Sequence, residues 1–295
     1  MWFVVQLEEY AARSGDRAMV DALKPKVLAL FDYFKKFENE DGLLEKLEKW
    51  VFVEWSAANQ FVQDLNYPTN MLYAGTLAAA GRMYGMPELV EKAQRIRQVI
   101  REQSFDGEFF VDNAVYENGE RKVTRNRSEV CQYFAFFFDV ASPETHGELW
   151  EKLHKEFGPD RGETKAYPEV HPANSFIGNM LRFELLSRYG LGSQITGESA
   201  GYLMYMAERT GTLPVERLRR ALDTVQTEHA LLQAQISWTE DTGLRFEPAP
   251  GARIGLQCHQ SSVDGWHGLI EQELSTLFPT GTAPLMRCLY IALAP

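Results

Sequence analysis

The feature that most constrains the fold is a helical spacing of apolar residues, which repeats along residues 1–213. The clearest segment has the i, i+3, i+4, i+7 spacing of an amphipathic helix, and its apolar residues are Leu23, Val27, Leu30, Phe31 and Phe34. Asp16 precedes this segment as the expected N-cap. Further helices are expected at about 69–84, from Pro87, and at 128–140, 144–157, 175–189 and 198–209. Helix pairs joined by irregular loops are typical of an α/α toroid, so a mainly α fold is predicted.

Two other features complete this outline. An extended hairpin is predicted around Asn118-Gly119, a dipeptide that favours a tight turn. Residues 214–295 have an α/β pattern, with helices around 218–225 and 266–277 and strands at 231–238, 244–247, 253–258 and 285–293. All eleven lysines lie between Lys24 and Lys165. We therefore predict two domains, residues 1–213 and residues 214–295.

The composition excludes several kinds of partner and cofactor. A formal net charge of −11 argues against nucleic acid or an anionic membrane surface as the main partner. No apolar run reaches the roughly 18–20 residues of a membrane-spanning helix. The start of the sequence lacks the basic region and cleavage site of a signal peptide. The three cysteines have no metal-binding spacing, and their odd number suits a reducing compartment. We expect a cytoplasmic protein that uses no metal and no cofactor.

One segment concentrates aromatic and acidic residues outside any helical spacing, namely Trp50-Val-Phe-Val-Glu-Trp-Ser-Ala-Ala-Asn59. Sugar sites combine flat apolar rings, which stack on pyranose C–H groups, with carboxylates or amides that bind hydroxyls. Trp55, Glu54 and Asn59 fit these roles. The alternative is that both tryptophans fill the core and Glu54 lies on the surface. A second loop, Tyr167-Pro-Glu-Val-His-Pro172, offers Glu169 and His171 for similar roles, with a rigid capped loop as the alternative.

Four more segments follow the aromatic one in order: Tyr67-Pro-Thr-Asn-Met-Leu-Tyr-Ala74, Ser128-Glu-Val-Cys-Gln132, Pro172-Ala-Asn-Ser-Phe-Ile-Gly-Asn179 and Gly201-Tyr-Leu-Met-Tyr-Met-Ala-Glu-Arg-Thr-Gly-Thr-Leu213. Together the five resemble part of the six-hairpin catalytic domain of bacterial α-L-rhamnosidases, glycoside hydrolase family 78. The resemblance covers about residues 1–213. It implies an incomplete (α/α)6 toroid, inverting hydrolysis of terminal rhamnosides without a cofactor, and a sugar-facing wall that includes Glu54, Trp55, Asn59, Glu169 and His171.

The sequence departs from this family at the catalytic residues. In the family, the general acid lies in an acidic stretch upstream of the helix that opens this chain, and no such stretch occurs here. The general base follows a Thr-x-Trp or Thr-Leu-Trp segment, whereas here Thr212-Leu213 leads to Pro214-Val215-Glu216. Glu216 is the candidate base, displaced by one residue and expected to begin a new helix. The resemblance therefore implies a carbohydrate-binding protein that is catalytically incomplete.

The last 80 residues have a resemblance of their own. The segments Gly211–Leu232 and Ala283–Tyr290 resemble the opening part of condensation-type acyltransferase domains. The active-site motif of that family, His-His-x-x-x-Asp-Gly, is imitated by His259-Gln-Ser-Ser-Val-Asp264-Gly265, with glutamine in place of the second histidine. Acyl transfer by this segment is the alternative function. A fusion product without activity is a further alternative, because both patterns overlap near 210–213.

The expected number of helices predicts an exposed apolar surface through which the chain could associate. About eight helices precede residue 213, whereas a closed toroid of this kind needs twelve. The open side of an incomplete ring exposes apolar helix faces beyond what ordinary monomers show. We therefore expect self-association through the open edge of the toroid, and the resemblance to family 78 implies a carbohydrate ligand, a rhamnoside.

Overall fold

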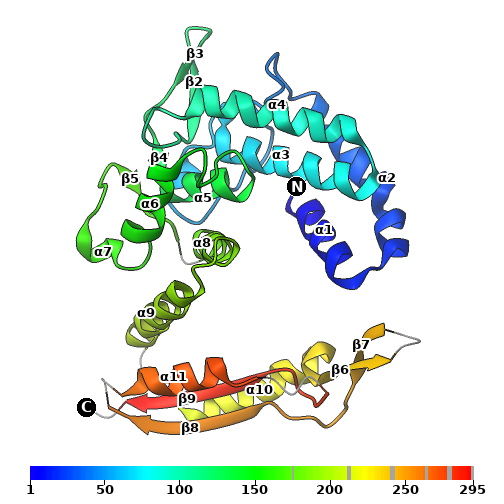
Figure 1. Cartoon of the computed structure of the whole chain (residues 1–295), viewed down its shortest axis with the longest axis vertical. Helices are drawn as coiled ribbons and strands as arrows, with labels where there is room; N and C mark the ends of the chain where they lie inside the picture. The colour runs from blue at the N-terminus through cyan, green and yellow to red at the C-terminus, as the bar shows by residue number, and fades with distance from the viewer. Residues whose placement is uncertain (175, 211–213, 240–242, 263–264, 278–280, 294–295) are drawn as a thin grey trace. The chain divides into compact units, whose positions relative to one another are not determined.

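The structure is a computed structural model, and it describes residues 1–174, 176–210, 214–239, 243–262, 265–277 and 281–293 (Figure 1). The chain forms two compact units, Met1–Ile195 and Thr196–Pro295, named here the N-terminal and the C-terminal unit. Helical hairpins make up most of the N-terminal unit, which confirms the predicted mainly α fold. The division falls within helix α9 (Gly192–Thr210), and the domain boundary at residue 213 stays a prediction.

The N-terminal unit is built from helices joined by loops and short strands. Its other helices are α1 (Trp2–Ser14), α2 (Arg17–Lys35), α3 (Tyr67–Tyr84), α4 (Pro87–Ser104), α5 (Glu129–Phe137), α6 (Gly147–Glu156), α7 (Arg161–Thr164) and α8 (Ile177–Arg188). Its strands are β1 (Leu65–Asn66), β2 (Asn113–Glu117), β3 (Glu120–Val123), β4 (Arg127–Ser128) and β5 (Val170–His171). A 3-10 turn covers Ala57–Gln60.

Side-chain caps determine where several of these helices begin. Asp16 accepts a hydrogen bond from the Met19 amide at the start of α2, which confirms the cap predicted from the sequence. Asn66 caps α3 through the Thr69 amide at 2.9 Å. Ser128 caps α5. Each cap pairs an amide that has no partner within its own helix, so polar loop residues define the helix starts.

Helices α3 and α5 form the centre of the N-terminal unit. Nearly every residue of both is buried, and α3 packs against α1, α4 and α5, while α5 also packs against α8 (Figure 1). Small residues allow this close approach. A Cβ atom at Gly75 would collide with the Phe138 ring, and one at Gly81 would lie 2.6 Å from the Val90 side chain. The glycines of α3 therefore permit contacts that larger residues exclude.

Two small sheets organise the loops around this core. Strands β1, β2 and β3 pair antiparallel in that order. Asn118 and Gly119 form the turn between β2 and β3 with φ values of 52° and 86°, so the predicted hairpin is confirmed. Strand β4 pairs in parallel with β5 through Arg127↔Val170 and Ser128↔His171. This second sheet holds the loop of Glu169 and His171 beside the start of α5.

The C-terminal unit has the α/β character that the sequence predicts. It contains α10 (Val215–Glu228), a 3-10 turn at Ala230–Gln233, β6 (Ala234–Thr239), β7 (Gly243–Pro248), β8 (Gly255–Ser261), α11 (Trp266–Ser275) and β9 (Arg287–Leu293). Strands β6 and β7 form an antiparallel hairpin, and β8 pairs in parallel with β9. The buried Gln226 amide group bonds to the backbone of Leu232, Ala252 and Ile254 and so joins α10 to the loops. Within the described ranges, no helix has the length and apolarity required to cross a membrane.

Candidate functional site

The segment of residues 50–55, the aromatic loop, carries three rings in mutual contact. The ring centroids of Phe52 lie 5.0 Å from those of both Trp50 and Trp55, and the two tryptophans are 6.0 Å apart. Trp50 is 69 % exposed and Trp55 is 62 % exposed, whereas Glu54 is fully buried. The alternative of core tryptophans with a surface Glu54 is therefore wrong, since the burial of these residues is the reverse. We name the three rings the aromatic cluster.

A cavity of about 280 Å³ adjoins the aromatic cluster. It is lined mainly by apolar side chains of α2, α3, α5 and the aromatic loop, together with Met1 before α1, and these side chains include Tyr33, Phe34, Leu72, Phe134, Trp50 and Phe52. Among the residues described as lining it, Glu48 is the acidic one, and its carboxylate lies 3.3 Å from Lys36 Nζ. Apolar rings beside a cavity are suited to a ligand with a flat C–H face.

Glu54 connects the aromatic loop to α8. Its Oε1 atom accepts a hydrogen bond from the Gly178 amide at 2.5 Å, while Oε2 is buried and has no hydrogen-bond partner. A Cβ atom at residue 178 would lie 2.6 Å from Oε1 and 2.5 Å from the Ala173 Cβ, so only glycine permits this approach. Glu54 lies outside the residues that line the cavity. Its carboxylate thus links the aromatic loop to the first turn of α8.

Burial raises the pKa of the Glu54 carboxyl above its ordinary value. The negative charge of Glu129 acts in the same direction, and hydrogen-bond donors nearby oppose it, namely the Ser56 hydroxyl and the amides of Asn174 and Gly178. Although these donors lie near the carboxyl group, its Oε2 atom has no hydrogen-bond partner. Burial is the dominant cause, so a proton stays on Glu54 to a higher pH than on an exposed glutamate.

Asn59 also has a clear local partner. Its Oδ1 atom accepts a hydrogen bond from the Val53 amide at 3.0 Å, and Ser56 caps the 3-10 turn that contains Asn59. The Asn174 side chain donates a hydrogen bond to the Trp55 carbonyl at 2.6 Å. These contacts hold the backbone on both sides of Trp55, while its ring contacts those of Trp50 and Phe52.

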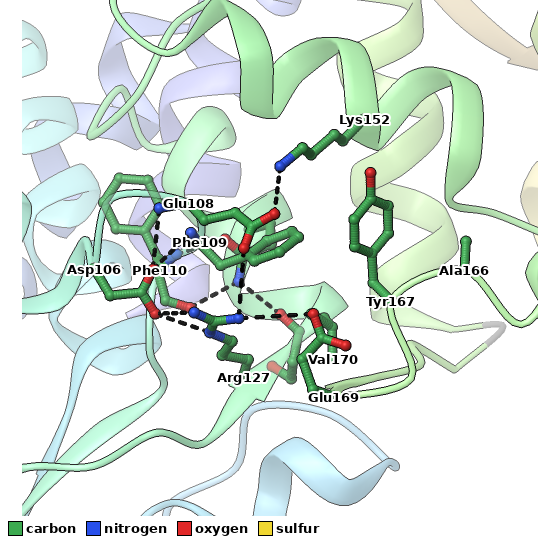
Figure 2. A network of polar contacts seen from close by, with 12 residues as sticks. Asp106, Glu108, Phe109, Phe110, Arg127, Lys152, Ala166, Tyr167, Glu169 and Val170 are labelled. Atoms are coloured by element: carbon green, nitrogen blue, oxygen red, sulfur yellow. Dashed lines mark hydrogen bonds and ion pairs between the residues drawn. The ribbon is translucent and has the colours of Figure 1, made fainter.

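Glu169 and His171 lie on the second predicted loop, and both are exposed. The His171 ring faces the Phe61 ring at 5.4 Å, which brings this loop next to the end of the 3-10 turn. Glu169 lies 3.7 Å from Arg127, whose guanidinium also binds Asp106 at 2.6 Å (Figure 2). Glu169 thus belongs to a surface network of charges, which Figure 2 shows together with Glu108 and Lys152.

A buried polar network around Glu129, which the sequence did not reveal, binds the backbone of the loop that carries Glu169 and His171. Glu129 Oε2 lies 2.8 Å from Arg161 Nη1 and accepts a hydrogen bond from the Ala173 amide at 3.2 Å. Its Oε1 accepts the Tyr133 hydroxyl at 2.5 Å. Arg161 also donates to the carbonyls of Ala166, Tyr167 and Val170. In the sequence, Ser128-Glu129 indicates only the start of a helix, because no local pattern links Glu129 to Arg161, which lies 32 residues later.

Asp112 is a third buried carboxylate of the N-terminal unit, after Glu54 and Glu129. Both its oxygens accept hydrogen bonds of 2.6 Å from Ser128, one from the amide and one from the hydroxyl. Burial nevertheless raises the pKa of the Asp112 carboxyl to about 7. Within the described ranges, no group of three His, Cys, Asp or Glu side chains is arranged to hold a metal ion.

The remaining candidate residues belong to the C-terminal unit. Glu216 is exposed in the first turn of α10, where a carboxylate stabilises the positive end of the helix dipole. Its role as a catalytic base stays a prediction. His259 is exposed on β8, and Asp264, the other residue of the imitated acyltransferase motif, lies outside the described residues.

Comparisons with known proteins identify the fold of the chain. No protein-family model and no curated protein matches the sequence. Among solved structures, it is similar to a GH78 family rhamnosidase of Bacillus sp. GL1, with a TM-score of 0.54, 19 % identity, and coverage of 65 % of this chain and 20 % of that one. It is also similar to a rhamnosidase from Klebsiella oxytoca with rhamnose bound, with a TM-score of 0.53, 17 % identity, and coverage of 70 % and 37 %.

The chain thus spans between a fifth and two fifths of the length of these two proteins. The resemblance of residues 211–295 to condensation-type acyltransferases has no support in these comparisons and stays a prediction. The resemblance to family 78 is supported by the fold. The chain has a glycoside hydrolase-like fold that is distantly similar to that of GH78 rhamnosidases.

Proposed function

We propose that the N-terminal unit binds the terminal deoxyhexose of a rhamnoside at the aromatic cluster. The observation that carries this proposal is the exposure of two neighbouring indole rings on a fold similar to rhamnosidases. Trp50 lines the cavity, and the ring centroid of Trp55 lies 6.0 Å from that of Trp50. An exposed indole ring offers a flat apolar face to the C–H groups of a sugar ring. A 6-deoxy sugar carries a methyl group where an ordinary hexose carries a hydroxymethyl group, which increases the apolar area that such a ring covers.

Binding is favoured over turnover by the arrangement of acidic residues. Glycosidases work with two carboxyl groups on either side of the scissile bond. Glu48 is the acidic residue among those described as lining the cavity, and it is paired with Lys36. The Glu54 side chain is fully buried and accepts a hydrogen bond from the Gly178 amide. Hydrolysis of a rhamnoside is the second candidate function, supported by the similarity of the fold.

A binding titration tests the first proposal. Methyl α-L-rhamnoside is titrated into the full chain, and the affinity is measured by calorimetry and by tryptophan fluorescence. Trp55→Ala should weaken binding by about tenfold, since loss of one aromatic contact of about 1.4 kcal/mol corresponds to that factor. The matched control is Trp238→Ala, which removes another exposed tryptophan, 65 % exposed on β6. Equal affinity of both variants and the wild type, or no binding at all, would contradict the proposal.

A turnover assay separates the two candidates. We expect no release of nitrophenol from an aryl α-L-rhamnoside above the uncatalysed rate. Release that is lost in Glu216→Gln, while binding of methyl α-L-rhamnoside is kept, would instead establish hydrolysis and assign Glu216 as a catalytic group.

A further inference from the structure

An exposed lysine lies at the edge of the cavity that adjoins the aromatic cluster. Lys49 directly precedes the aromatic loop, and it lines the cavity of about 280 Å³ together with Trp50 and Phe52. This volume is close to the lower end of the range of about 300–1,000 Å³ for ligand pockets, so it suits a single sugar ring. A sugar held next to the aromatic cluster therefore meets a positive charge.

The charge of Lys49 has no internal partner in the part of the chain that the structure describes. Its backbone is left-handed, with φ 67°, which is uncommon for a residue other than glycine and is frequent at ligand-binding sites. Lys46 has a similar backbone, with φ 49°, but its amide donates a hydrogen bond to the Asp64 carbonyl and its ammonium group lies 4.2 Å from the centroid of the Tyr116 ring. Internal contacts thus account for Lys46 and not for Lys49.

The edge of the cavity is positive although the whole chain is acidic. Among the residues described as lining the cavity, Glu48 and Lys49 have the charged side chains. Glu48 is matched by Lys36, whose Nζ atom lies 3.3 Å from the Glu48 carboxylate and 5.2 Å from the ring centroid of Tyr33, another lining residue. Two ammonium groups therefore lie beside one carboxylate, in a chain whose formal net charge is −11. A local positive charge of this kind favours an anionic ligand, which most of the surface repels.

We propose that this cavity binds a negatively charged sugar residue, a uronic acid, whose carboxylate pairs with Lys49. The inference rests on the proposed function, which places the terminal deoxyhexose on the aromatic cluster. A rhamnosyl residue has no ionisable group, so the charge belongs to the sugar to which the deoxyhexose is linked. Trp50 belongs to the aromatic cluster and also lines the cavity, which makes the two binding positions adjacent. Lys49 is then a specificity-determining residue, which selects an acidic neighbouring sugar over a neutral one.

Two ligands that differ in one group test this specificity. A rhamnosyl glucuronide and its carboxyl-reduced counterpart, the rhamnosyl glucoside of the same linkage, are titrated into the full chain at pH 7 and low salt, and calorimetry measures both affinities. The glucuronide should bind about threefold to fivefold more tightly, which is the factor that one exposed ion pair supplies. This preference should disappear at high salt, because an ionic strength of about 1 M shortens the Debye length to about 3 Å.

Two variants with opposite expected effects connect the preference to the cavity edge. Lys49→Met removes the charge and keeps an unbranched side chain, so the affinities of the two ligands should come within about twofold of each other. Glu48→Gln removes the nearby carboxylate and should strengthen binding of the glucuronide by about twofold, with no change for the glucoside. Lys165→Met is the matched control and should keep the wild-type preference. Lys165 is another exposed lysine with a left-handed backbone, φ 55°, and it lies outside the residues that line the cavity.

The outcomes separate this inference from the proposed function. A preference for the glucuronide that Lys49→Met abolishes and Lys165→Met keeps supports the inference. Equal affinities of the wild type for the two ligands overturn it, while the proposed function stands. A preference that survives Lys49→Met also overturns it, since the carboxylate is then bound elsewhere. If neither ligand binds, the proposed function fails, and this inference fails with it.

Discussion

Glu54 Oε1 accepts a 2.5 Å hydrogen bond from the amide of Gly178, a residue 124 positions later in the sequence. This bond joins the aromatic loop to the first turn of α8. Asn174, on the same stretch, bonds to the Trp55 carbonyl. The exposed tryptophan therefore depends on the loop before α8 for its position.

Gly178→Ala should break this connection. The added Cβ would lie 2.6 Å from Glu54 Oε1 and 2.5 Å from Ala173 Cβ, so the loop has to move. Overpacking of this kind costs about 1–3 kcal/mol of unfolding free energy. Urea denaturation measures it. Gly147→Ala, at the start of α6 with open space around it, is the control and should leave stability nearly unchanged. Similar stabilities of the two variants would show that the Glu54 contact is not close.

Asp112 should make the stability of the native state depend on pH. Because the native pKa is raised from 3.8 to about 7, the native state keeps a proton that the unfolded chain has lost. The contribution of Asp112 to stability is full below about pH 4 and is lost as the pH rises through about 7. Asp112→Asn should therefore gain stability relative to the wild type at pH 8 and much less at pH 4.

Urea denaturation at pH 4, 6 and 8 measures this difference. Asp32→Asn, an exposed carboxyl on α2, is the control and should follow the wild-type profile. A constant difference between Asp112→Asn and the wild type over this range would mean that Asp112 ionises normally in the folded chain.

The Glu129–Arg161 pair should be strongly coupled. Arg161→Ala leaves the buried Glu129 carboxylate without its cation, and breaking a buried ion pair in this way costs about 3–5 kcal/mol. The double variant Glu129→Gln/Arg161→Ala should cost clearly less than the sum of the two single variants, because no charge is then stranded. Additive effects in the cycle would show that the two groups act separately. Lys122→Ala, which removes the exposed pair with Glu117, gives the reference for a weak contact.

Asn66 should be more important for stability than its size indicates. Its side chain caps α3 through Thr69 and also donates to the Phe61 carbonyl, and the residue is buried. Asn66→Ala removes the cap and leaves buried polar groups unpaired, at a cost of about 2–3 kcal/mol. Thermal and urea unfolding measure the loss. Gln98→Ala, on the exposed side of α4, should have little effect.

The elements of the fold that depend on neighbouring residues could be predicted from the sequence. The spacing of Leu23, Val27 and Phe34 predicted α2, and Asn118-Gly119 predicted the hairpin that β2 and β3 form. The limits of α5 are less accurate. It ends at Phe137 rather than near residue 140, because Asp139 adopts a left-handed conformation with φ 57°. The four-residue α7 has too few positions to show any apolar period.

The candidate site could be located from the sequence but not oriented. The segment 50–59, which contains the aromatic loop, is identifiable in the sequence because its aromatic residues and Glu54 follow no helical spacing. Whether Trp55 or Glu54 faces solvent depends on Gly178, which no local pattern links to the loop. The same holds for Glu129, whose burial depends on Arg161. The burial of Glu54 and Glu129 could not be predicted because it depends on contacts between residues that are far apart in the sequence.

Helix α9 has a practical consequence for dissecting the chain. Because Ile195 and Thr196 are successive residues of one helix, a cut between the two units would pass through its first turns. A fragment ending there would lose the carbonyl acceptors and amide donors that the continuous helix supplies to itself. Fragments that stop before Gly192, or extend through Thr210, preserve whole hydrogen-bonded turns and are the ones to express separately.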